Sequence, residues 1–404
     1  MNPPEPSAIS ANRRSLSGVT LRVMNRLVSL SKPPRPSAAP TGRRSLSDAT
    51  LLVVNRLRSM AKPPTPSLLS LVYLVALLGV IAAYVALRTA RPLYTPFYIA
   101  ALVVIVVFAC LAQGSPLSFF ALSLVLASIY ITLALTWDFS SGLTGYVNFG
   151  LPFFFGVGAF TAGYFSWYGN RNVPFLLFAA ILFGLLGGLL FSVPTLRLRG
   201  PYFSLLSLLL PFIAVDFVTT FWTQLKMPTL GYYDLPFLGA TPGAELVTLS
   251  FANAVLLTAF VLMKESHFGL VMRGIRDDED AVSSQGIRTF PYKVVAFTVA
   301  SGVAGFSGAT YAMVVTYAGL DGFGFTFLIF PILIVVVGGM GEITGSVFAG
   351  YVVILLYQYM FQAFTEITLV VFTAATIVLV LFLPRGIIGP VRSFLQFMRT
   401  PEGS

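Results

Sequence analysis

The sequence predicts an all-α, polytopic integral membrane protein with about ten transmembrane helices and one broken or re-entrant glycine-rich segment. Hydrophobic residues make up 56% of the chain and charged residues only 10%. Soluble domains carry about a quarter charged residues, so this chain has too little polar surface to cover a water-soluble globule. Several apolar runs also have the ~20 residues that a helix needs to cross a hydrocarbon core of roughly 30 Å.

Eleven apolar segments follow one another from Ser67 onward. Each is expected to be helical, because backbone polar groups in lipid need hydrogen-bond partners within the protein. The segments are 68–87, 97–112, 117–136, 143–165, 173–193, 201–222, 246–263, 294–318, 325–341, 344–362 and 365–383.

The N-terminal residues 1–67 form a separate, basic region rich in Ser, Pro and Arg. They hold eleven basic and two acidic residues, which accounts for most of the chain's net charge of +10. Residues 13–37 recur as 43–67, and each copy contains a short stretch with apolar residues at helical spacing. The region is either an amphipathic helix pair on an anionic membrane surface or a solvated extension. Three domains are therefore predicted: the extension 1–67, a membrane domain 68–390 and a tail 391–404.

Basic links predict the orientation of the spans. The N-terminal extension, Arg197 with Arg199, the link 264–293 and the C-terminus are all expected on the cytoplasmic side. These assignments agree only if one segment between 68 and 193 does not cross. We expect 143–165 to be that segment, because its glycines and Pro152 interrupt a helix.

The link 264–293 is the longest charged stretch of the membrane domain. Between Arg273 and Asp280 it holds two cations and four acids. Each charge would cost about 3 kcal/mol in the middle of a bilayer, so the link must lie in water or against another protein. Residues 276–285 are expected to form a short polar helix that ends at Gly286.

The order of residues in this link resembles the cytoplasmic coupling segment of ABC importer permeases. That segment has the form Glu, Ala, Ala and then Gly, and Glu279, Ala281, Val282 and Gly286 match it, with Val282 in place of the second Ala. Further matching stretches lie at 141–159, 196–202, 337–341 and 384–389. Over roughly residues 120–390 the chain thus resembles the M-type (LivM) family of branched-chain amino acid ABC permeases.

This resemblance implies a non-catalytic subunit that takes up branched-chain or related amino acids across the plasma (inner) membrane of a prokaryote. Its implied partners are two ABC ATPase subunits, a second homologous permease and an extracytoplasmic solute-binding protein, with no nucleic acid. The chain itself would bind no cofactor, and the ATPase subunits would use ATP and Mg. Both termini would be cytoplasmic. The residues implied to couple to the ATPase are Arg273, Arg276, Asp277, Asp278, Glu279, Ala281, Val282 and Gly286.

Two glycine-rich segments, 142–165 and 319–346, are candidates for a path through the membrane. Interrupted helices free backbone groups that suit a zwitterionic solute, although close helix packing explains the glycines equally well. The candidate path residues are Thr144, Tyr146, Asn148 and, as a charge within a span, Asp216. Asp138 and Glu342 fall at predicted span ends and are expected to be solvated.

Three other functions stay open. A urea or short-amide importer uses the same type of permease. An ion-coupled secondary transporter would need paired acids deep in the spans, where Asp216 is the single candidate. A membrane-embedded enzyme would need clustered His, Cys or carboxylates, and the chain has one His and one Cys.

Overall fold

A computed structural model describes residues 118–198, 200–221, 231–239 and 241–363. This part is helical apart from one antiparallel pair of two-residue strands. Five of its helices are long and apolar enough to cross a membrane, or up to six if one bent pair counts as a span. A helical membrane protein is therefore confirmed. The duplicated extension and the segments 68–87, 97–112 and 365–383 lie outside the described residues, so the expected total of about ten spans stays a prediction.

The elements follow the apolar segments of the sequence closely. In chain order they are α5 (Ser118–Trp137), the π-helix η1 (Asp138–Gly142), α6 (Leu151–Trp167), α7 (Val173–Thr195), α8 (Pro201–Phe221), β1 (Tyr232–Tyr233), α9 (Pro242–Glu265), α10 (His267–Ser284), α11 (Thr289–Val315), β2 (Tyr317–Ala318), the 3₁₀-helix η2 (Leu320–Phe323), α12 (Thr326–Gly338) and α13 (Ile343–Ala363).

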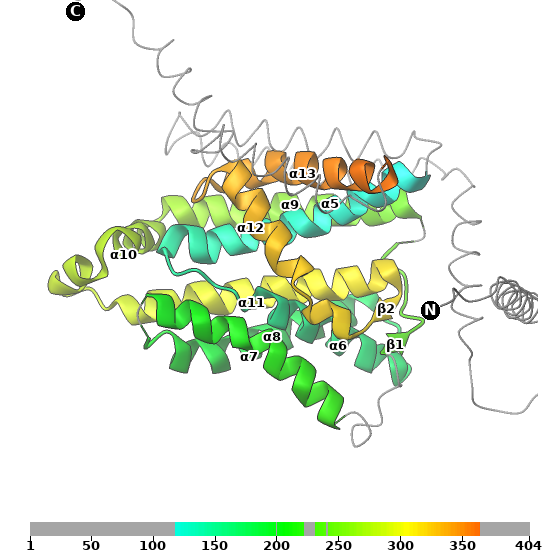
Figure 1. The fold of residues 1–404 in the computed structure, drawn as a ribbon, viewed down its shortest axis with the longest axis horizontal. Coiled ribbons are helices and arrows are strands. Elements are labelled where there is room, and N and C mark those ends of the chain that lie inside the picture. Colours follow the sequence, from blue (N-terminus) through cyan, green and yellow to red (C-terminus); the bar gives the residue numbers. More distant parts are fainter. Residues whose placement is uncertain (1–117, 199, 222–230, 240, 364–404) are drawn as a thin grey trace, which may run out of the picture. The chain divides into compact units, whose positions relative to one another are not determined.

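Helix α11 lies between two groups of helices (Figure 1). Helices α5, α9 and α13 pack together on one side, and α6, α7 and α8 lie on the other. Helix α10 marks one end of this bundle and the strands β1 and β2 mark the opposite end. We call these the α10 end and the strand end.

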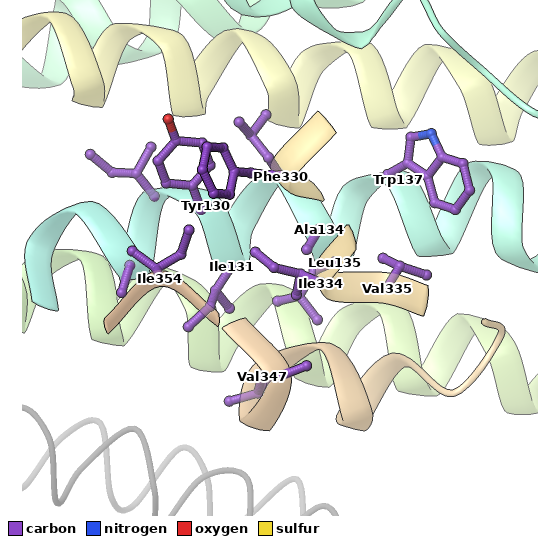
Figure 2. Close-up of a cluster of buried hydrophobic side chains, with 14 of the residues drawn as sticks. Tyr130, Ile131, Ala134, Leu135, Trp137, Phe330, Ile334, Val335, Val347 and Ile354 are labelled. Atoms are coloured by element: carbon purple, nitrogen blue, oxygen red, sulfur yellow. The ribbon is translucent and has the colours of Figure 1, made fainter. Parts of the chain in front are cut away.

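Helix α5 forms the centre of the main apolar core (Figure 2). Its side chains from Tyr130 to Trp137 are buried against α12 and α13, including Phe330, Ile334 and Val347. The Tyr130 and Phe330 rings lie 5.2 Å apart. Because α5 is enclosed on all sides, it is apolar around its whole circumference rather than along one stripe.

Glycines allow α6 and α11 to pack with their backbones in contact. A Cβ atom at Gly158 would overlap the carbonyl of Gly305, and one at Gly308 would overlap the carbonyl of Phe155. Small residues permit such close approach between helices in membranes. The packing explanation of the glycine-rich segment 142–165 therefore holds for at least these positions.

The segment 143–165 is broken, as predicted. Its start lies beside α10, where Gly145 contacts Arg276, and its helical part ends beside β1, where Gly163 contacts Tyr232. These contacts lie at opposite ends of the bundle (Figure 1). The segment therefore extends from one end of the bundle to the other, and the expectation that it does not cross the membrane stays a prediction.

Side chains make possible the non-helical part of this segment, residues 145–150, which we call the extended segment. Trp137 donates its indole N–H to the Asn148 carbonyl (2.9 Å), and Ser204 donates to the Val147 carbonyl (2.8 Å). The Asn148 side chain accepts from the Gly150 N–H (2.8 Å), and Ser207 accepts from the Phe149 N–H (3.0 Å). Irregular backbone is tolerated at membrane depth when protein groups satisfy it in this way.

The second glycine-rich segment contains a sharp turn between α12 and α13, which meet at an angle of 117°. Gly339 and Gly341 have positive φ angles (+106° and +83°), which favour glycine. The turn lies at the α10 end, because Gly341 contacts Arg276. The two interrupted segments therefore meet near α10.

Candidate coupling site

The charged link predicted from the sequence is mainly helix α10, which is kinked at Asp278 (φ −159°, ψ 106°). The Asp278 carboxylate accepts hydrogen bonds from the N–H groups of Asp280 (2.9 Å) and Ala281 (3.0 Å). It is therefore the N-cap of a second short helix, which begins at Glu279. Gly286 (φ +82°) follows its end, as predicted. The polar helix starts later than the predicted 276 because Asp278 caps it.

The two halves of α10 differ in exposure. In the first half Gly269, Val271, Met272 and Ile275 are buried against the bundle. From Arg276 onward the exposed residues of α10 and its end are polar or small: Arg276, Asp277, Asp278, Asp280, Ala281, Ser283, Ser284, Gln285 and Gly286. The predicted polar strip thus lies at the surface of one end of the bundle and not among the spans.

Two of the expected coupling residues pack back onto the chain. Arg273 donates hydrogen bonds to the carbonyls of Gly269 and Lys264, both at 3.3 Å, and so stabilises the junction of α9 and α10. The Val282 side chain lies against Gly274, and a Cβ atom added to Gly274 would come within 2.9 Å of the Val282 Cγ2 atom. Val282 therefore occupies the space left by the absent side chain of Gly274, in the half of α10 before the kink.

Glu279 also turns inward, although it belongs to the exposed half of α10. Its carboxylate accepts hydrogen bonds from Lys293 (2.7 Å), Thr289 (2.7 Å) and the Tyr146 hydroxyl. Lys293 is 3% exposed and lies 4.4 Å above the Tyr146 ring. Burial favours a raised pKa for Glu279, but the hydrogen bonds from Lys293, Tyr146 and Thr289 outweigh it and lower the pKa. The site holds an ion pair that joins α10, α11 and the extended segment.

Arg276 contacts both interrupted segments. Its guanidinium Nη1 donates to the carbonyl of Gly142 (2.7 Å) and lies close to Gly341. The fully buried Asp138 accepts a hydrogen bond from the Gly341 N–H (2.7 Å). The expectation that Asp138 is solvated at a span end is wrong, because η1 extends α5 into the protein interior.

The ion pair between Lys264 and Glu342 (3.0 Å) lies beside these contacts. The sequence does not indicate that Lys264 and Lys293 are buried, because both lie in the charged link 264–293, where solvation is the simpler assumption. Their burial (6% and 3% exposed) marks them as structural charges. The one signal of burial in the sequence is that apolar residues adjoin each lysine, as Val294 and Val295 do after Lys293.

A cleft of about 740 Å³ opens at the α10 end. The extended segment, the start of α8 and the kinked part of α10 line it, and Thr144, Tyr146 and Glu279 are among its walls. Asn148 is buried behind it and caps the backbone. Asp216 is exposed on α8 and does not line this cleft. The structure therefore brings two of the four candidate path residues together.

The described chain is similar to known transport proteins. Residues 119–381 match a family model described as "Branched-chain amino acid transport system / permease component". Among curated proteins, the high-affinity branched-chain amino acid permease LivM of Escherichia coli is 26% identical over 299 residues, or 67% of this chain and 70% of the relative.

Two further relatives agree with this match. LivM of Salmonella typhimurium is 26% identical over 66% of this chain and 69% of its own length. A nucleoside ABC transporter permease of Lactococcus lactis is 28% identical over 43% of this chain and 60% of its own length. No solved structure matches the chain.

Proposed function

The chain belongs to the family of permease components of branched-chain amino acid transport systems, and from this premise we propose that it is the M-type membrane subunit of an ABC importer for branched-chain or related amino acids. The observation that carries the proposal is the exposed polar end of α10 between two apolar helices. A helix of this kind cannot lie in lipid, and at the end of a bundle it is placed to bind a soluble motor subunit.

The proposed complex contains two ATPase subunits, which bind ATP and Mg, a second homologous permease and an extracytoplasmic solute-binding protein. The docking surface on this chain comprises Asp277, Asp278, Asp280, Ala281 and Gly286. The family match supports this assembly. We place the complex in the inner membrane of a prokaryote, with the α10 end and both termini cytoplasmic, because basic links mark that side.

The proposed path for the solute runs along the extended segment to the cleft at the α10 end. Thr144 and Tyr146 line its exit, and Asn148 holds the backbone in shape. Asp216 is exposed on α8 beside Phe212 and Phe217. A carboxylate in lipid costs about 3 kcal/mol at mid-helix. We therefore propose that this face of α8 borders the path or the second permease rather than lipid.

The solute itself requires a direct measurement, because one relative carries a nucleoside permease name and two carry branched-chain amino acid names. Uptake of labelled leucine by the complete complex is expected to compete with isoleucine and valine. Competition by urea or acetamide, with none by these amino acids, would instead assign the short-amide importer.

The docking proposal is tested with two matched glycine variants. Gly286→Trp and Gly169→Trp both place a large side chain at a positive φ angle (+82° and +95°) with no atoms within 4 Å of the added Cβ. Gly169 lies at the strand end, between α6 and α7. Because the backbone strain is matched, only the tryptophan at 286 should prevent the ATPase subunits from copurifying with the permease.

Membrane insertion of both variants, followed by gel filtration in detergent, is the control for folding. Retention of the ATPase subunits by Gly286→Trp, with wild-type leucine uptake, would refute docking at this helix.

A further inference from the structure

We propose that Glu279 does not bind the ATPase, and that Arg276 and Glu279 are positioning residues that connect α10 to the two interrupted segments. The inference rests on the proposed docking of α10 and assigns a second, inward-facing role to the same helix. On this view the exposed residues of α10 receive the motion of the ATPase, and these two side chains pass it to the path.

The Glu279 carboxylate uses three of its roughly four acceptor positions inside the permease. One oxygen, Oε1, accepts from Lys293 and Thr289, and the other, Oε2, accepts from Tyr146. The side chain is 16% exposed. A docking residue would have to give up these charge-assisted hydrogen bonds. The geometry therefore places Glu279 within the permease.

The inner contacts of α10 fall on the break in the first segment. Arg276 holds the carbonyl of Gly142, the last residue of the π-helix η1. Glu279 holds the hydroxyl of Tyr146, within the extended stretch that follows. Between these points the helix ends after Thr144, and Gly145 has a positive φ angle (+75°). A π-helix followed by extended backbone marks a site that can change conformation.

The same contacts extend to the second segment through Asp138. Its Oδ1 accepts from the Gly341 N–H in the turn between α12 and α13, and Arg276 lies against the same glycine. A Cβ atom at Gly142 would come within 3.1 Å of the Gly341 backbone nitrogen, so η1 and this turn are in close contact. A displacement of Arg276 therefore acts on both interrupted segments together.

Asp138 also has a free acceptor at this junction. Its Oδ2 is buried without a hydrogen-bond partner among the described residues. A buried polar atom without a partner destabilises the conformation that contains it. Any rearrangement that brings a donor to Oδ2 is favoured accordingly. The junction thus has a physical reason to adopt a second arrangement during transport.

Tyr146→Phe is the decisive variant, because it removes one hydroxyl and keeps the ring that packs at 5.7 Å from Phe203. In a reconstituted complex whose wild-type form transports leucine, ATP hydrolysis should continue and the ATPase subunits should copurify. The amount of leucine moved per ATP hydrolysed should fall about tenfold, because the variant loses the hydrogen bonds of the hydroxyl with Glu279 and Lys293. Arg276→Ala should produce the same uncoupling.

Two matched controls lie close to this network. Tyr292→Phe removes a hydroxyl from a tyrosine of α11 that stacks on Phe268, and Asp277→Asn removes an exposed charge next to Arg276. Tyr292→Phe should leave the leucine-to-ATP ratio unchanged, and Asp277→Asn should affect only binding of the ATPase.

The outcomes separate the two proposals. Loss of ATPase binding in a stably folded Tyr146→Phe or Glu279→Gln permease would make Glu279 a docking contact and overturn the inference. An unchanged leucine-to-ATP ratio in Tyr146→Phe and Arg276→Ala would also overturn it. Failure of the wild-type permease to bind any ATPase would refute the proposed function itself.

Discussion

Single charges in this protein have roles that depend on contacts distant in the sequence. Glu279 matches the coupling signature, and the pattern alone places it at a docking surface, whereas its partners are Tyr146 and Lys293. Asp138 was expected in solvent and is fully buried. Local charge density predicts which segment leaves the lipid, but it does not predict the direction of a side chain, which tertiary packing decides.

The ion pair of Glu279 predicts a dependence of stability on pH. Its pKa in the folded protein lies below the ordinary value of 4.5 because of the hydrogen bonds from Lys293, Tyr146 and Thr289, which outweigh burial. The stabilisation is therefore fully present above about pH 4.5 and is lost as the pH falls through the lower, folded-state pKa. Above that range Glu279→Gln should be less stable than wild type, because Lys293 is left buried without its counter-charge.

This difference is measured by thermal unfolding in detergent at about pH 7 and about pH 4. The gap between wild type and Glu279→Gln should narrow at the lower pH. Asp277→Asn, on the exposed side of α10, is the matched control. A gap that is equal at both pH values would show that the carboxylate is not held in its charged form by these partners.

At the scale of elements, the apolar runs located the helices but not the way in which one of them is broken. Glycines and Pro152 predicted an interruption in 143–165. They did not reveal that Trp137, Ser204 and Ser207 satisfy the non-helical backbone. These donors and acceptors come from α5 and α8, so no window within the segment contains the information.

Close contact of α6 with α11 makes Gly158 sensitive to substitution. Gly158→Ala would place its Cβ against the Gly305 carbonyl, so the helices would have to move apart at a cost of about 1–3 kcal/mol. In α7, Gly187 has its nearest neighbours at 3.8 Å, an ordinary contact distance. Gly187→Ala should therefore be neutral or stabilising, since alanine is the better helix former.

Unfolding in a detergent series compares the two alanine variants with wild type. We expect Gly158→Ala to be less stable than wild type and Gly187→Ala to be at least as stable as wild type. Equal stability of both variants would mean that α6 and α11 are not packed with their backbones in contact.

For the whole molecule, composition and hydropathy were enough to predict a helical membrane bundle, and the order of several weak motifs was enough to predict its family. Whether the number of spans is odd or even could not be predicted, because it depends on whether each interrupted segment crosses the membrane. The extent of 143–167, from the α10 end to the strand end, favours a crossing instead, and a cytoplasmic α10 then places Gly169 outside. The N-terminal extension is then cytoplasmic only if an odd number of segments crosses between 68 and 112.

Cysteine labelling in intact cells tests this orientation directly. In a Cys110→Ser background, which removes the single native cysteine, one cysteine is introduced at Gly169, Gly286 or Ser37. An impermeant thiol reagent should label Gly169→Cys at once, and Gly286→Cys only after the cells are permeabilised, because the positions lie at opposite ends of the bundle. Ser37→Cys should behave like Gly286→Cys. Labelling of both positions 169 and 286 in intact cells would contradict the expectation that 143–167 crosses the membrane. Labelling of positions 37 and 169, but not of position 286, would place the basic extension outside.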